Sequence, residues 1–122
     1  MRAKNTISAA ILLASLGAAL LGCYDKSAKE RAAEAVLRTN LHTLRDVIDQ
    51  YHGDRKRYPE SLRALVDAGY LRKVPLDPYT YSNSTWQVTY ETPSRPGAAR
   101  GIVDVHSGAP GNTQEGVPLA KL

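Results

Sequence analysis

The chain has 122 residues, a formal net charge of +4 and 43% hydrophobic residues. This length indicates one domain, since domains centre near about 100–150 residues. The apolar share is too high for a disordered chain and too low for a protein that crosses a membrane several times. The presence of one Cys excludes an internal disulfide framework and a Cys-rich metal cluster.

Residues 1–22 have the pattern of a secretory signal peptide. A basic head, Met1 to Lys4, precedes a run from Ile7 to Gly22 that contains no charged residue. As a helix these 16 residues extend about 24 Å, which is short for a bilayer core of roughly 30 Å. A basic head, a short apolar run and a small residue before a cleavage site are typical of a signal that is removed.

The run Leu20-Leu21-Gly22-Cys23 resembles the lipobox of bacterial lipoproteins. The resemblance implies that the Cys23 thiol is the lipid-attachment site, acylated with chains such as palmitate, and that Cys23 becomes the new N-terminus. Residues 23–26 would then form a lipidated tether. Lipoproteins of this class carry two or three acyl chains, enough for lasting attachment. An uncleaved membrane anchor and a buried Cys without a role are the alternatives.

Cleavage before Cys23 changes the expected charge and location of the protein. Loss of Arg2 and Lys4 lowers the formal charge to +2, from 14 Lys and Arg against 12 Asp and Glu, so nothing points to a nucleic-acid partner. Tyr24 follows the Cys, whereas in lipoproteins of diderm bacteria an Asp at this place retains the protein in the inner membrane. We therefore expect a lipid anchor at the periplasmic face of a bacterial membrane, with the outer membrane slightly favoured.

The domain expected over residues 27–122 opens with a long amphipathic helix, from Ser27 to about His52. Its apolar residues recur at spacings of four and three, and the stripe consists of Leu37, Leu41, Leu44, Ile48 and Tyr51, widened by Val36 and Val47. Ser27 with Glu30 fits a capping box at its start, and Gly53 is placed to end it at positive φ. The segment from Ser27 to Glu34 would hold the domain off the membrane or contact a partner.

A basic loop, Arg55-Lys56-Arg57, leads to a short second helix. Pro59 suits the first turn of that helix, where its missing N–H is not needed, and Gly69 suits its end. Leu62, Leu65 and Val66 share one face of it. The two prolines of the run 74–78 exclude a helix there.

Two strands are expected next, over Thr85–Glu91 and Gly101–Ser107. Apolar residues alternate with polar ones in both, so that Trp86, Val88 and Tyr90 share a face in the first strand, and Val103 and Val105 in the second. The connecting run from Thr92 to Arg100 contains two prolines and a glycine, which is typical of a loop. The expected fold is α+β, with the long helix packed on a small antiparallel sheet.

The order of these features resembles the periplasmic part of the major pseudopilins of type II secretion. The residues that carry the resemblance are the helix motif Ala35-Val36-Leu37, Leu41, Leu44 and Ile48-Asp49-Gln50-Tyr51, then Tyr58-Pro59, Leu62, Leu65-Val66, Gly69-Tyr70-Leu71, Pro75, Asp77-Pro78 and the strand Asp104-Val105-His106-Ser107-Gly108. Together they extend from about Glu34 to Gly111. The resemblance implies a pilin-like fold and a role in type II secretion or a related pilus-like machine.

The N-terminus departs from the pattern of that family. Pilin-type proteins keep their hydrophobic segment after a short leader is cut, and that segment forms the core of the filament. Here the chain contains no Phe, no Glu lies between Ile7 and Gly22, and cleavage before Cys23 would discard the segment. A lipid would replace it, so filament membership does not follow from the resemblance.

The terminal loop of the family resembles an oxygen-ligand calcium site. In this chain Ser107-Gly108-Ala109 is followed by Pro110, and Glu115 is the one acid that remains downstream. Calcium takes six to eight oxygens, several of them charged. We therefore expect no cofactor, with calcium in this loop as the alternative.

The sequence shows no convincing catalytic or metal-binding arrangement. His42 and His52 are about 80° out of register on a helix at roughly 100° per residue, so with His106 they predict no metal site. Asp46 and Asp49 are expected on a solvated helix flank. No serine has a recognisable catalytic setting, and we expect that the protein is not an enzyme.

One hydrolase alternative would need Asp104, His106 and Ser107 to share a pocket, although strict alternation places Asp104 and Ser107 on opposite strand faces. The basic residues Arg55-Lys56-Arg57 and Arg72-Lys73 are the best candidate for a contact surface, against the alternative of a solvated loop.

The sequence thus predicts a lipid-anchored, pseudopilin-like periplasmic protein that acts through protein–protein contacts. Its expected partners are the membrane, through the lipid, and secretion or pilus machinery proteins, with other pseudopilins as candidates. The alternative is a free-standing lipoprotein that uses the same fold as a binding module.

Overall fold

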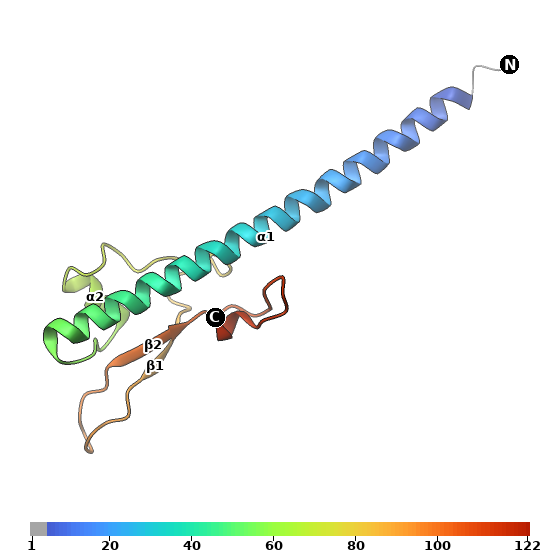
Figure 1. Cartoon of the computed structure of the whole chain (residues 1–122). Helices are drawn as coiled ribbons and strands as arrows, with labels where there is room; N and C mark the ends of the chain where they lie inside the picture. The colour runs from blue at the N-terminus through green and yellow to red at the C-terminus, as the bar shows by residue number, and fades with distance from the viewer. Residues whose placement is uncertain (1–4) are drawn as a thin grey trace. The chain divides into compact units, whose positions relative to one another are not determined.

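The computed structural model describes the backbone of residues 5–122 and the side chains of residues 26–122. The chain divides into two units, Met1–Ala32 and Ala33–Leu122. In chain order the elements are the helices α1 (Asn5–Arg55) and α2 (Leu62–Asp67), the strands β1 (Gln87–Tyr90) and β2 (Ile102–His106), and a 3₁₀ turn, η1 (Leu119–Lys121) (Figure 1). A search of the described residues for a helix with the length and apolarity of a membrane span found none.

The predicted α+β class is confirmed, and so is the buried stripe of the long helix. The α1 side chains that are buried are Leu37, Leu41, Leu44, Val47, Ile48 and Tyr51. They pack in one core with Leu65 of α2, Trp86, Ile102 and Val105 of β2, and Leu119 of η1. Val36 was predicted to widen the stripe, which is wrong: it is 48% exposed.

Both predicted ends of the long helix need correction. Ser27 does not cap an N-terminus, because α1 passes through it. Gly53 lies inside α1, and the left-handed residue after the last turn is Lys56, with φ 57°. The Lys56 amide closes that turn by donating to the carbonyl of His52 at 2.9 Å. A hydrogen bond of this kind satisfies one of the carbonyls that the end of a helix leaves open.

The short helix α2 begins later than predicted. Its N-cap is Ser61, whose hydroxyl accepts from the Ala64 amide at 3.1 Å. Pro59 therefore precedes the helix, and its carbonyl accepts from the Ile102 amide at 2.8 Å. The prediction for Gly69 is confirmed: it has φ 84°, and the Tyr70 amide donates back to the carbonyl of Leu65.

The sheet is an antiparallel pair, β1 and β2, with a bulge that sequence alternation did not predict. Thr89 pairs with Asp104 and Tyr90 with Ile102, which leaves Val103 as the extra residue. A bulge shifts the in-and-out order by one residue. Ile102 and Val105 are therefore both buried, whereas the predicted inward position of Val103 is wrong.

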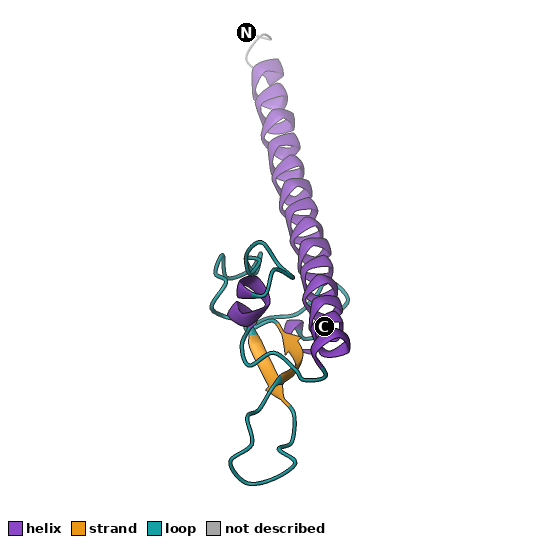
Figure 2. Cartoon of the chain, turned by 90° about the vertical axis from the view of Figure 1, so that its left-hand side faces the viewer, coloured by secondary structure: helices purple, strands orange, loops and turns teal. Residues whose placement is uncertain are grey.

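The first strand is also less buried than predicted. Trp86 is buried and Val88 half-buried, but Tyr90 is 47% exposed, so its predicted inward position is wrong. The residues that connect the strands form the expected loop, which projects beyond the ends of both strands (Figure 2). At its base, the Glu91 amide donates to the carbonyl of Gly101 at 2.9 Å.

Gly101 allows the loop before α2 to lie against the start of β2. A Cβ at this position would overlap the Cβ of Tyr58 and come within 2.9 Å of the Tyr58 backbone. The neighbouring hydrogen bond from Ile102 to Pro59 uses this close approach. This contact and this hydrogen bond hold Tyr58-Pro59 against the start of β2, just before α2 begins.

Candidate functional site

The lipidation prediction lies outside the residues whose side chains the structure describes. Cys23 is part of the helical backbone of α1, and its side chain is among those left undescribed. The signal peptide of residues 1–22 and most of the tether of residues 23–26 lie in the same region. Lipid attachment at Cys23 therefore stays a prediction from the sequence.

The three histidines have separate local partners. His42 Nε2 lies 3.2 Å from Asp46 Oδ2 on the exposed face of α1. His52 stacks on Tyr58, with ring centroids 4.0 Å apart. His106 Nε2 lies 3.2 Å from an oxygen of Asp104. Among the residues with described side chains, no group of three or more His, Cys, Asp or Glu could hold a metal ion.

The residues of the hydrolase alternative come only partly together. Asp104 and His106 are paired, but the buried Ser107 hydroxyl donates to Asp77 Oδ2 at 2.5 Å. The same oxygen of Ser107 accepts from the Ala109 amide at 3.1 Å. Ser107 therefore ties two segments together, and Asp77, which sequence reasoning did not select, is its partner.

Asp77 is fully buried and organises the turn that follows it. Its Oδ1 accepts from the Tyr79 amide at 2.8 Å, while its own amide donates to the carbonyl of Ser82 at 2.9 Å. The Tyr81 amide donates to the carbonyl of Asp77 at 2.8 Å. These bonds, with the bond from Ser107, fix both the turn and its position against the end of β2.

Tyr81 is the exposed point of this turn. Its φ is 55°, in the left-handed region, and its side chain is 83% exposed. That backbone costs roughly 1–2 kcal/mol in a residue other than glycine. An aromatic ring in this position recovers none of the cost by burial, so the reason for a tyrosine here is not packing within the chain.

Arg45 joins α1 to β2 and to the last described residue. Its Nε lies 2.8 Å from Asp104 Oδ1, and its two terminal nitrogens donate to the carbonyls of Val105 at 2.8 Å and Leu122 at 3.0 Å. His106 Nδ1 lies 3.4 Å from the same guanidinium.

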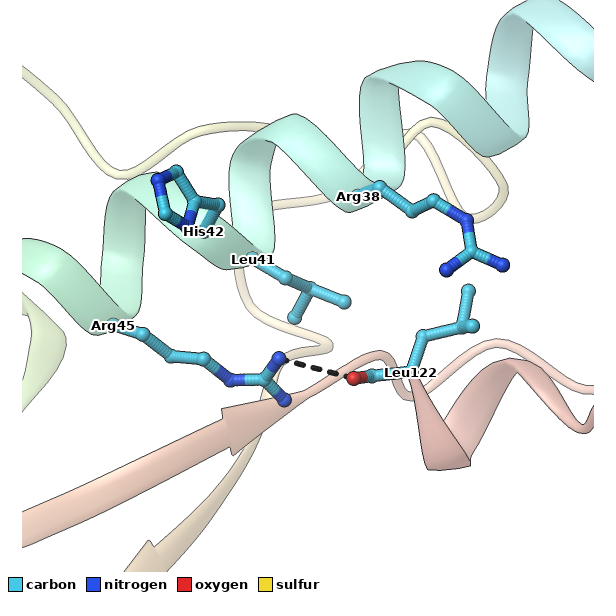
Figure 3. A pocket seen from close by; sticks show the side chains of 5 residues that line it. All are labelled: Arg38, Leu41, His42, Arg45 and Leu122. Atoms are coloured by element: carbon cyan, nitrogen blue, oxygen red, sulfur yellow. Dashed lines mark hydrogen bonds between the residues drawn. The ribbon is translucent and has the colours of Figure 1, made fainter.

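The Arg45 network lowers the pKa of Asp104. Burial by itself raises this pKa, but the hydrogen bond from the Val105 amide and the bond and charge of Arg45 together outweigh it, with a smaller contribution from His106. A shallow pocket of about 180 Å³ lies beside the network, lined by Arg38, Leu41, His42, Arg45 and Leu122 (Figure 3).

The predicted basic surface divides into two parts. The Arg55 guanidinium lies over the rings of Tyr51, at 5.0 Å, and Tyr70, at 6.0 Å. The Tyr70 hydroxyl donates to Asp54 at 2.6 Å, and this hydrogen bond raises the pKa of Tyr70, with burial adding to it and Arg55 opposing it. Arg55 is thus held by its own neighbours.

The second part of the basic surface is a pocket. Arg72 and Lys73 line a hollow of about 280 Å³ together with Arg63, Val66, Val74 and Asn83. Arg63 pairs with Asp67, whereas within residues 26–122 no ion pair joins Arg72 or Lys73 to a carboxylate. Sequence reasoning selected Arg72 and Lys73 but missed Arg63 and Asn83, because a pocket built from three separate segments leaves no local pattern.

The loop proposed as an alternative calcium site has few oxygens to offer. The Ser107 hydroxyl is bound to Asp77 and Ala109 is buried, while Glu115 is exposed. The loop is closed by its own backbone, with the Thr113 amide donating to the carbonyl of Val117 at 2.7 Å.

Comparison of the chain with protein-family models, curated protein sequences and solved structures found no match in any of the three.

Proposed function

We propose that the protein is a lipid-anchored, pseudopilin-like component of a type II secretion or type IV pilus-related system, which acts through protein–protein contacts. Cys23 carries the lipid and residues 23–26 form the tether. The anchor places the domain at the periplasmic face of a bacterial membrane, and Tyr24 favours the outer membrane.

The observation that carries this proposal is the order of the motifs along the chain. The helix stripe, Tyr58-Pro59, Gly69-Tyr70-Leu71 and Asp77-Pro78 follow one another as they do in the major pseudopilins. Each motif also has a structural task in this chain. The Pro59 carbonyl bonds to β2, Gly69 ends α2 at positive φ, and Asp77 binds Ser107 at the end of β2. A set of residues that together form one core is a more specific resemblance than any single dipeptide.

The distribution of polar groups also supports a role in contacts. In the described part of the chain, every buried side-chain nitrogen and oxygen has a hydrogen-bond partner. Tyr81 and Leu76 are among the large apolar side chains that lie exposed, and within residues 26–122 Arg72 and Lys73 form no ion pair with a carboxylate. These exposed groups are available for contacts with other molecules.

The lipid anchor is tested by mass spectrometry of the N-terminus of the purified protein. We expect a first residue Cys23 with acyl chains attached, and we expect Cys23→Ser to give an unacylated precursor. Leu21→Ala is the matched control, because a small residue suits that lipobox position and should leave processing intact. A wild-type chain that keeps residues 1–22 without a lipid would contradict the anchor.

The role in secretion is tested in a strain that lacks the chain. We expect the set of secreted proteins to shrink and to be restored by the wild-type chain but not by Cys23→Ser. An unchanged set of secreted proteins and unchanged pili, with the lipid present, would instead favour the free-standing binding module.

A further inference from the structure

We propose that Tyr81 and the adjoining basic pocket form one docking face for an acidic segment of a partner protein. We call this the Tyr81 face, made of Tyr81, Asn83, Arg72, Lys73 and Arg63. The inference rests on the proposed role in protein–protein contacts and adds to it the place of one contact and the chemistry of the partner.

The rigidity of the turn is the first step. The Asp77 carboxylate accepts from the Tyr79 amide and from the Ser107 hydroxyl, and two backbone bonds close the turn around it. Tyr81 is thus held in a left-handed conformation with its ring exposed. Strained backbone that the surroundings hold in place is concentrated at functional sites, and Tyr is among the residue types enriched at the energetic centres of interfaces.

The charge of the pocket gives the sign of the partner. Three cations line the hollow, and the one nearby carboxylate that pairs with them, Asp67, is taken by Arg63. Asn83 lines the same hollow and is two residues from Tyr81 in the chain. Arg72 and Lys73 are exposed donors without an acidic partner in the described chain, and carboxylates are the groups they fit.

The pocket beside Arg45 gives the contrast. Its polar side chains already have acidic partners within the chain: Arg38 pairs with Glu34 at 3.0 Å, His42 lies 3.2 Å from Asp46, and Arg45 binds Asp104. Two of these pairs lie along α1 itself, and the third joins α1 to β2. Arg72 and Lys73 have no comparable task.

The lining of the pocket favours an apolar side chain of a peptide with acidic neighbours. The volume of the pocket, about 280 Å³, is close to the lower end of the roughly 300–1,000 Å³ of small-molecule sites. The half-buried Val66 and Val74 provide an apolar lining between the cations. A single apolar side chain fits this lining while acidic neighbours reach Arg72 and Lys73.

The test uses the full chain in non-ionic detergent and a set of blocked, dye-labelled heptapeptides with a central Leu and from zero to four acidic residues. Fluorescence anisotropy should show affinity that rises with the number of acids. Arg72→Glu with Lys73→Glu should weaken binding at least tenfold. Arg95→Glu with Arg100→Glu, which makes the same charge change in the loop between the strands, should weaken it less than threefold.

Tyr81→Asn separates a contact role from a structural one, because Asn tolerates the left-handed region and relieves the strain. We expect it to weaken peptide binding at least fivefold while the melting temperature stays the same or rises. Failure of every peptide to bind, equal weakening by the two charge reversals, or unchanged binding by Tyr81→Asn would overturn the docking face.

Two further measurements test whether a membrane or a second copy of the chain, instead of an acidic peptide, binds the Tyr81 face. Binding to phosphatidylglycerol vesicles that Arg72→Glu with Lys73→Glu abolishes, without peptide binding, would make the face a membrane contact and refute the proposal. Self-association in sedimentation that acidic peptides do not displace would assign it to a second copy and refute it as well. The proposed function is judged separately, since lipidation of Cys23 and the secretion phenotype are measured without the Tyr81 face.

Discussion

The hydrogen bond between Asp77 and Ser107 is expected to stabilise the domain measurably. Both side chains are fully buried, and the Ser107 hydroxyl lies 2.5 Å from Asp77 Oδ2. Asp77→Asn keeps an oxygen for the Tyr79 amide but places an amide donor opposite the Ser107 donor. Ser107→Ala removes the hydroxyl and leaves the second Asp77 oxygen without its partner.

The magnitude follows from the kind of bond. A hydrogen bond to a charged group contributes about 1.5–3 kcal/mol to stability. Each single variant also changes the burial of a polar group, so the coupling between the two substitutions is the better quantity. We expect a coupling free energy of about 1.5–3 kcal/mol, which in a domain of this size corresponds to a shift in melting temperature of about 6–24 °C.

Urea unfolding of the wild type, both single variants and the double variant, followed by circular dichroism, measures this coupling. The bond from the Ala109 amide to Ser107 is lost in both variants that carry Ser107→Ala, so it cancels in the cycle. A coupling below about 0.5 kcal/mol, the usual limit of additivity, would refute the idea that this bond holds the turn against β2.

The remaining predictions concern pH and close packing. Because the pKa of Asp104 is lowered in the folded state, its stabilisation is present above the ordinary pKa near 3.8 and is lost as the pH falls through the lower folded value. The destabilisation by Arg45→Ala, measured by urea unfolding, should therefore be smaller at pH 3 than at pH 7; an equal loss at both would contradict the network. Gly101→Ala should lower stability by about 1–3 kcal/mol in thermal melts, since its Cβ would overlap Tyr58. Gly53→Ala, with open space around it, should raise stability by up to about 1 kcal/mol, and a similar loss in both variants would show that the contact at Gly101 has no special role.

The sequence predicted the long helix well because one repeating pattern covers it. Leu37, Leu41, Leu44, Ile48 and Tyr51 follow the helical period, and all five are buried. The period depends only on backbone geometry, so nothing distant in the chain had to be known. The position of Gly69 was also predicted correctly, because the rule that favours glycine after the last turn of a helix is local too.

The strands were predicted less accurately because a bulge has no local signal. Strict alternation assigned Val103 to the core, but the extra residue between the pairs of β2 moved Ile102 inward in its place. Apolar residues occupy 102, 103 and 105, so the sequence permits either register. The contact of Gly101 with Tyr58, which is 43 residues away in the chain, selects between them.

The candidate contact surface was predicted only in part, for a related reason. Arg72 and Lys73 were selected as a local run of charge, but the pocket also needs Arg63 from α2 and Asn83 from the turn. Tyr81 was not selected, because an exposed tyrosine in a sequence looks like any other loop residue. Its significance lies in a φ of 55° and in the buried carboxylate that holds the turn, and that carboxylate is bound by Ser107, which is 30 residues further along the chain.

The Asp77 turn also links the stability of the domain to its proposed contact. Burying a carboxylate costs free energy unless hydrogen bonds compensate, and the left-handed Tyr81 adds a further cost. A glycine at position 81 would avoid the second cost, whereas an apolar residue at 77 would leave the Tyr79 amide and the Ser107 hydroxyl without their acceptor. The turn leaves Tyr81 exposed, two residues before Asn83 of the hollow that Arg72 and Lys73 line, and within residues 26–122 neither cation pairs with a carboxylate. If the ring serves a contact, relieving the strain should stabilise the domain and weaken the contact together, whereas a purely structural tyrosine would not couple the two.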